Sequence, residues 1–257
     1  MSERAADRPS ARRSAARTAV VWEAVRRVLE TPGAEGRARI IDIGGGTGGF
    51  AVRLAELGHR VTVVDPSPDA LAALDRRAAE SGVTALVTGV QGDLAGLPDL
   101  AGAEGADAGD ADLVLCHGVL EVVPDPAAAL ATLAGVLRPG GSLSLLVAQR
   151  HAAVIARAMA GHFQQARTLL DASAGDGRTG HRSGHRFTHD ELTALLTGAG
   201  LRLTTVHGIR VFADLVPGSL LDLEPGSTAA LVELERAVAE RPEYLPLATQ
   251  LHVLAQR

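Results

Sequence analysis

The chain has 257 residues, of which 46% are hydrophobic, 21% charged and 2% aromatic, and its formal net charge is −5. This is the composition of a globular domain, and it argues against a broadly basic nucleic-acid-binding surface and an aromatic stacking platform. The absence of lysine excludes a catalytic lysine, and the single cysteine, Cys116, excludes an internal disulfide. No apolar run approaches the ~20 residues of a membrane span, and the polar N-terminal stretch is not a secretory signal, so we expect a cytoplasmic protein.

Strands and helices alternate through the first part of the chain. Residues 1–16 are expected to form a flexible tail, and the apolar spacing over 18–29 predicts an amphipathic helix. The predicted strands are 39–43, 61–64, 85–90, 113–116 and 143–147, and the predicted helices between them are 50–57, 68–79 and 126–137. The stretch 95–111, rich in Gly, Ala and Asp, is expected to be a loop. This alternation predicts repeated βαβ units and a doubly wound parallel sheet.

The pattern changes after Arg150. Thr188 and Glu191 have the spacing of a capping box at the start of a helix. The further predicted elements are a helix at 151–170, a loop at 171–186, a helix from the capping box to Leu196, a strand at 201–206, a helix at 228–239 and a strand at 247–255. Residues 17–257 are expected to form one domain, in which inserts at about 151–187 and 213–246 form a substrate cap.

Two other features have structural interpretations. Cys116 is expected to be a buried strand residue, because no neighbouring base is evident. His181, His185 and His189 are spaced by four, as on a metal-binding helix face, but Gly180 and Gly184 disfavour a helix there. We therefore expect no metal site.

A glycine-rich segment, Gly44-Gly-Gly-Thr-Gly-Gly, follows the first predicted strand. Glycines let the backbone approach a ligand closely, and doubly wound folds bind ligands at the carboxyl ends of their strands. Asp65 ends the second strand, 21 residues after Gly44, where a carboxylate can accept both ribose hydroxyl protons. Asp93, in Gly92-Asp93-Leu94 after the third strand, suits an adenine amino group. A tight strand–helix turn without a ligand is the structural alternative for the glycines.

Together with the segment Leu137-Arg-Pro-Gly-Gly-Ser-Leu143, these residues resemble the class I S-adenosylmethionine-dependent methyltransferases, from about Arg39 to Leu146. The resemblance implies a Rossmann-like sheet of seven mostly parallel strands, with an antiparallel last strand and helical cap inserts. It implies S-adenosyl-L-methionine as the cofactor. The implied cofactor-binding residues are Asp42 at the methionine end, Gly44, Gly45 and Gly46 beneath it, Asp65 at the ribose, and Gly92, Asp93 and Leu94 at the adenine.

A second resemblance extends from about Arg17 to the C-terminus. The stretch Cys116-His-Gly-Val-Leu-Glu-Val-Val-Pro-Asp-Pro126 is similar to that of the tRNA wobble 5-carboxymethoxyuridine carboxyl-methyltransferases. This resemblance implies that Arg17 binds the cofactor carboxylate and that His117 lines the cofactor site. The chain departs from that family at residues 177–186, an arginine-rich loop where the family has a lysine-rich one.

The methyl acceptor is left open by these patterns. A carboxylate acceptor is already ionised at pH 7 and needs no general base. The candidate catalytic residues are then His117 and two arginines that would orient the acceptor, Arg210 and Arg150, although Arg210 could instead pair with Asp214. The negative net charge and scarce aromatics favour a small-molecule carboxylate or hydroxyl, whereas the basic loop favours tRNA. A nicotinamide-dependent dehydrogenase and a non-catalytic binding protein are the remote alternatives.

Overall fold

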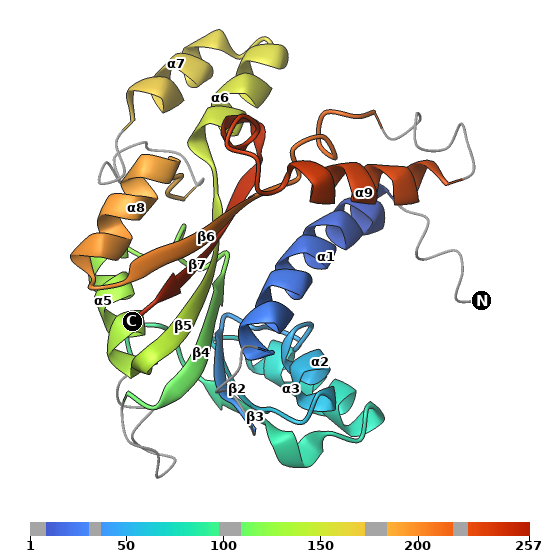
Figure 1. The fold of residues 1–257 in the computed structure, drawn as a ribbon, viewed down its shortest axis with the longest axis vertical. Helices are drawn as coiled ribbons and strands as arrows, with labels where there is room; N and C mark the ends of the chain where they lie inside the picture. The colour runs from blue at the N-terminus through green and yellow to red at the C-terminus, as the bar shows by residue number, and fades with distance from the viewer. Residues whose placement is uncertain (1–8, 31–36, 98–108, 173–183, 218–225) are drawn as a thin grey trace. The chain divides into compact units, whose positions relative to one another are not determined.

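The structure, a computed structural model, describes residues 9–30, 37–97, 109–172, 184–217 and 226–257, with residues 9–17 described as backbone only. Its strands form one seven-stranded sheet in the order β3-β2-β1-β4-β5-β7-β6 (Figure 1). The strands are β1 (Arg39–Ile43), β2 (Arg60–Asp65), β3 (Val87–Gln91), β4 (Ala111–His117), β5 (Leu137–Ala148), β6 (Arg202–Ile209) and β7 (Gln250–Gln256). Strands β1 to β5 pair in parallel, and β7 is antiparallel, which confirms the predicted fold class.

The chain divides into two compact units, which we describe separately. The sheet unit comprises residues 28–147, 192–204 and 253–257 and contains the five parallel strands. The helical unit comprises residues 1–27, 148–191 and 205–252. Both predicted inserts, at about 151–187 and 213–246, fall within the helical unit. Their role as a substrate cap stays a prediction.

The sheet unit buries its central strands completely. Ile40 on β1 and Leu113, Val114 and Leu115 on β4 have no exposed surface, as expected for parallel strands covered on both faces. Helices α2 (Ala51–Glu56) and α3 (Pro68–Glu80) lie on one side of these strands and α5 (Pro126–Val136) on the other (Figure 1). Helices α3 and α5 each begin with proline after a capping side chain. This start satisfies the amide groups that a helix leaves unpaired at its N-terminus.

The helical unit differs from the sequence prediction at two helices. Helix α1 spans Pro9–Leu29, so residues 9–16 are helical rather than a tail, while residues 1–8 lie outside the described part. Alanine and arginine are strong helix formers, and proline suits the first helical position. The predicted helix 151–170 is two helices, α6 (Arg150–Met159) and α7 (Phe163–Asp171). Gly161 lies between these two helices and has a φ of +75. It interrupts the single predicted helix, because an α-helix requires negative φ values.

The predicted capping box is confirmed. Helix α8 (His189–Gly198) begins directly after Thr188, whose hydroxyl accepts a hydrogen bond from the Glu191 amide at 3.2 Å. The Glu191 carboxylate in turn accepts from the Thr188 amide at 2.9 Å. Helix α9 spans Ser227–Val238. Short 3-10 turns at Thr84–Leu86 and Leu245–Leu247 occupy the predicted starts of β3 and β7.

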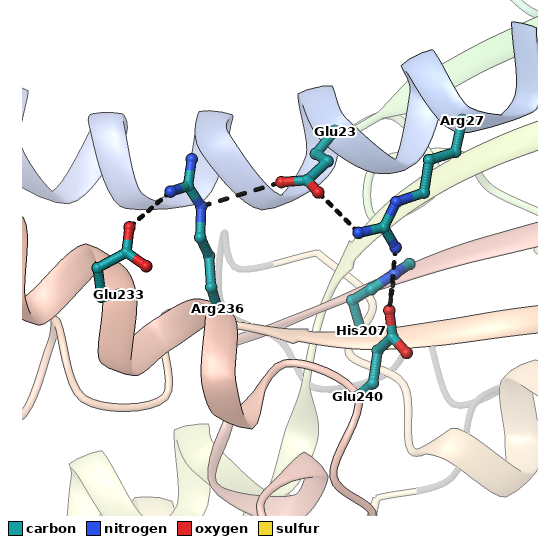
Figure 2. A network of polar contacts seen from close by, with 6 residues as sticks. All are labelled: Glu23, Arg27, His207, Glu233, Arg236 and Glu240. Atoms are coloured by element: carbon teal, nitrogen blue, oxygen red, sulfur yellow. Dashed lines mark hydrogen bonds and ion pairs between the residues drawn. The ribbon is translucent and has the colours of Figure 1, made fainter. Parts of the chain in front are cut away.

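Ion pairs link α1 to α9 and to the residues just after it, within the helical unit (Figure 2). Glu23 contacts Arg27 at 2.7 Å and Arg236 at 4.0 Å, and Arg27 reaches Glu240 at 3.5 Å. His207, buried on β6, contacts Glu240 at 3.4 Å and shares a 3.1 Å hydrogen bond with His252. Burial lowers the pKa of His207, an effect that Glu240 partly opposes.

No helix within the described residues is long and apolar enough to cross a membrane.

Candidate functional site

The glycine segment turns sharply between β1 and α2. Gly44, Gly46 and Gly48 have φ values of +67, +57 and +77, which L side chains rarely adopt. A Cβ at Gly44 would lie 2.5 Å from the Val119 side chain, so no other residue fits there. A Cβ at Gly46 would meet no atom closer than 3.9 Å. The turn is therefore packed at Gly44 and open at Gly46, as a surface that receives a ligand would be.

Asp65 holds this turn against the end of β2. Its Oδ2 accepts a hydrogen bond from the Gly46 amide at 2.9 Å, and its Oδ1 accepts from the Ser67 amide at 2.9 Å. An ionised carboxylate has about four acceptor positions, so two backbone bonds leave capacity for ligand hydroxyls. The side chain is thus oriented before any ligand arrives.

Asp42 lies beneath the turn on β1 and is 4% exposed. Burial is the larger cause and the negative charge of Asp65 the smaller, and together they raise the pKa of its carboxyl group to about 7. A Cβ at Gly45 would lie 2.5 Å from the Asp42 Oδ2, so the glycine permits their close approach. A buried carboxylate of this kind favours a positively charged ligand group beside it.

The segment after β3 completes this edge of the sheet. The Gly92 amide donates to the Asp65 carbonyl at 3.2 Å, which ties the ends of β2 and β3 together. Asp93 is exposed and accepts from the Gly96 amide at 3.1 Å, while Leu94 is buried. Of the predicted residues of this segment, Asp93 therefore has an exposed carboxylate, whereas Leu94 packs in the interior.

His117 is the last residue of β4, as predicted. Its Nε2 lies 2.8 Å from the Ser144 hydroxyl on β5, and its ring meets that of Phe50 edge-on at 5.2 Å between centroids. The strand register places Cys116 beside Ile43, so His117 follows at the level where the glycine turn begins. Cys116 itself is buried, and burial raises the pKa of its thiol, as expected for an inert strand cysteine.

Arg150, in the helical unit, is 7% exposed and has structural partners. Its guanidinium donates to the Glu191 carboxylate at 2.7 Å and to the Arg186 carbonyl at 3.1 Å. These bonds fasten the start of α6 to the capping box of α8. Its role as an acceptor-orienting residue stays a prediction. Arg17 lies on α1, where only the backbone is described.

Arg210 follows β6 and forms the ion pair with Asp214 that was the structural alternative. Its φ of +60 is unusual for a residue with a side chain. The Thr249 hydroxyl contacts the Asp214 carboxylate at 2.7 Å and the Arg210 carbonyl at 3.1 Å. The bend after Arg210 is held by buried Glu235, which accepts from the amides of Val211, Phe212 and Ala213 at 2.7–2.9 Å.

A cavity of about 280 Å³ lies within the helical unit. Its walls come from α6, from Asp214 and Leu215 after β6, and from Leu247 and Thr249 before β7. Its arginines are Arg157 and Arg186, and the candidate residues Arg150 and Arg210 are not among its lining residues. Sequence reasoning missed Arg157 because one arginine on an amphipathic helix has no local signature.

Comparison with known proteins decides the family. Residues 12–206 match the family model described as a methyltransferase domain. The chain is 31% identical to the tRNA 5-carboxymethoxyuridine methyltransferase of Escherichia coli (strain K12), over 94% of this chain and 88% of that protein. It is 34% identical to the ubiquinone biosynthesis O-methyltransferase of Xanthomonas axonopodis pv. citri (strain 306), over 67% of this chain and 66% of that protein. The chain belongs to the methyltransferase family.

Solved structures share the fold of this methyltransferase. An S-adenosylmethionine-dependent methyltransferase from Mesorhizobium loti has a TM-score of 0.58 at 20% identity, covering 93% of this chain and 98% of that one. The [4+2]-cyclase SpnF has a TM-score of 0.58 at 18% identity, covering 91% and 80%. Together with the family model and the 31% identity to the E. coli enzyme, they confirm the predicted recognition and enzyme class, an S-adenosylmethionine-dependent methyltransferase.

The sheet unit of this methyltransferase has the features that a nucleoside with a cationic amino-acid tail requires. Gly46 is open, Asp65 keeps acceptor capacity, and the buried Asp42 favours a neighbouring positive charge.

The sequence analysis did not identify two supporting residues of this site. Ser144 was detectable as a polar residue within an apolar strand, and Ser67 as the capping residue before Pro68. No cluster of three potential metal ligands occurs among the described residues.

Proposed function

We propose that the sheet unit binds S-adenosyl-L-methionine through Asp65, Asp42 and the glycine turn. The observation that carries this proposal is the fixed carboxylate of Asp65, oriented by the Gly46 and Ser67 amides. Asp65 would accept the ribose hydroxyls, Asp42 would face the cationic methionine end, and Asp93 with Gly92 and Leu94 would border the adenine. His117, oriented by Ser144, would line the methionine end. Ser144 is then a positioning residue for the His117 ring.

When bound, the cofactor would supply a methyl group from its sulfonium. An acceptor oxygen would form a bond to the methyl carbon as the bond from that carbon to sulfur breaks, and the demethylated thioether would leave. The chain contributes by binding the reactants in the correct orientation and by excluding water. A carboxylate acceptor is ionised at neutral pH, so no residue has to remove a proton from it. An acceptor hydroxyl would need a base, for which His117 is the candidate.

Cofactor binding can be tested by calorimetry with a chelator present. The wild-type protein should bind S-adenosyl-L-methionine in the micromolar range, about −8 kcal/mol. Asp65→Ala should lose about 1.5–3 kcal/mol for each charged hydrogen bond removed. Asp69→Ala, at an exposed position in the first turn of α3, is the matched control and should bind as the wild type does. Equal affinity of Asp65→Ala and the wild type would show that the proposed pose is wrong.

For the acceptor, we propose a carboxylate or hydroxyl of a small molecule. The negative net charge and the 2% of aromatic residues support this class, since proteins that bind single-stranded RNA use basic grooves and stacked rings. The similarity to a ubiquinone biosynthesis O-methyltransferase also supports it. The protein should transfer a radiolabelled methyl group to a component of a small-molecule extract and not to purified tRNA.

A tRNA acceptor is the second candidate, because the similarity to the E. coli tRNA methyltransferase covers 94% of the chain. The basic loop 177–186 would then contact the phosphate backbone; residues 177–183 of it lie outside the described part. Replacing Arg178, Arg182 and Arg186 by serine should weaken tRNA binding and flatten its salt dependence by up to about 2 units. Labelled tRNA, with loss of binding in this variant, would decide for the second candidate.

A further inference from the structure

The cavity of the helical unit has an apolar body made by small side chains. Ala152, Ala153 and Ala156 line it from α6, together with Ile155. Because alanine side chains are short, one face of the helix is left uncovered where larger residues would fill the space. At ~30 Å³ for each water-sized group, about 280 Å³ accommodates roughly nine or ten non-hydrogen atoms. The cavity therefore has the size of a small ligand.

Two leucines of the cavity are unusually exposed. Leu215 is 45% exposed and Leu247 is 37% exposed, although both line a concave surface. Exposed apolar side chains scattered singly need no explanation, but gathered at a concavity they mark a binding site for apolar groups. A ligand with a hydrocarbon body would remove this surface from water, at about 25 cal/mol for each Å² buried.

One arginine of the cavity, Arg157, has no carboxylate partner among the described residues. Asp214 is paired with Arg210 and also contacts the Thr249 hydroxyl, so its negative charge is already compensated. Arg157 and Arg186 add two positive charges to the lining. No carboxylate within the described residues lies within ion-pair distance of Arg157. Arginine binds carboxylates in a two-pronged geometry, so the lining is suited to an anion.

We propose that this cavity is a binding site for a small amphipathic carboxylate, with its hydrocarbon body among the α6 alanines and its carboxylate at Arg157. Gln149 preserves the shape of the site: its amide donates to the Leu245 and Pro246 carbonyls at 3.1 Å, and its Oε1 accepts from Ala152 at 2.9 Å. These bonds connect the start of α6 to the turn that carries Leu247. Because every residue named here belongs to the helical unit, the proposal is independent of the cofactor pose.

The test is calorimetry of the full-length protein with octanoate, octanol and octylammonium, without methyl donor. Octanoate should bind at least about tenfold more tightly than octanol, and octylammonium should bind least, because the three probes share one chain and differ in charge. Arg157→Gln should weaken octanoate binding about tenfold or more and leave octanol unchanged. Arg157→Lys should retain most of the binding, since it keeps the positive charge.

Two further variants separate the cavity from general effects. Ala156→Leu fills the cavity from an exposed position, where the larger side chain is tolerated, and should abolish binding of all three probes. Arg167→Gln removes an arginine that is 79% exposed on α7, and it should behave as the wild type does. Cofactor binding should persist in every variant, which separates this proposal from the proposed function. Equal binding of octanoate and octanol, or octanoate affinity unaffected by Ala156→Leu, would overturn the proposal.

Discussion

Asp42→Asn should stabilise the protein while weakening cofactor binding. Burial raises the pKa of Asp42 from its ordinary value of 3.8 to about 7 in the folded protein. The folded state therefore binds this proton more tightly than the unfolded state does. Stability from this group is fully present below pH 3.8 and is lost as the pH rises through 7. Asparagine has the shape of the protonated acid but cannot ionise, so the substitution removes the penalty at high pH.

The magnitude follows from the two pKa values. The values 3.8 and about 7 lie about three pH units apart, and about 1.4 kcal/mol per unit gives about 4 kcal/mol at pH 8.5. At pH 5.5 the folded carboxyl is protonated and only the unfolded one has ionised, so the gain should be about 2 kcal/mol. Urea unfolding of the cofactor-free protein at both pH values measures the difference.

Asp75→Asn is the matched control for Asp42→Asn. Asp75 is exposed on α3, so the same change of charge should alter the free energy of unfolding by less than about 0.5 kcal/mol at either pH. Asp42→Asn should also bind S-adenosyl-L-methionine more weakly, because the neutral amide does not attract the cationic end. A gain that is the same at pH 5.5 and 8.5, or a loss of stability at pH 8.5, would refute the reasoning.

Three further predictions concern the helical unit. Because the pKa of His207 is lowered in the folded protein, its contribution to stability is present above pH 6.5 and is lost as the pH falls below that value. His207→Gln should therefore reduce the loss of thermal stability at acid pH, measured in thermal melts. The control His151→Gln, at an exposed position, should not. Glu191→Gln should lower the free energy of unfolding by about 2 kcal/mol in urea titrations, because it leaves the buried Arg150 guanidinium without its charged partner. The control Glu56→Gln, at an exposed position, should have no such effect. Arg17→Ala should weaken binding of S-adenosyl-L-methionine but not of adenosine, which lacks the carboxylate, and equal affinities in calorimetry would make Arg17 a surface residue.

Much of the sheet unit around the glycine turn could be predicted from the sequence, because the sequence patterns that indicate it are local. About one βαβ unit contains a strand pattern, three glycines with positive φ and an aspartate at the end of a strand. The local backbone geometry accounts for each of these features. The capping box at Thr188 and Glu191 was likewise found from two residues three positions apart. Such features depend on neighbours in the chain, and the structure has them where the pattern indicated.

The tertiary structure showed which of two alternatives applies to Arg210, which partner Arg150 has, and where a cavity forms. Arg150 and Arg210 were the candidates for orienting the acceptor. The packing of the helices and turns around them pairs Arg150 with Glu191 and Arg210 with Asp214. Arg157 lines the cavity together with residues that follow β6 and precede β7, and Gln149 joins α6 to a turn almost a hundred residues away. Contacts of this length leave no periodicity in the sequence. The local geometry of the glycine turn could therefore be predicted from the sequence, whereas the environment of each arginine depended on the fold.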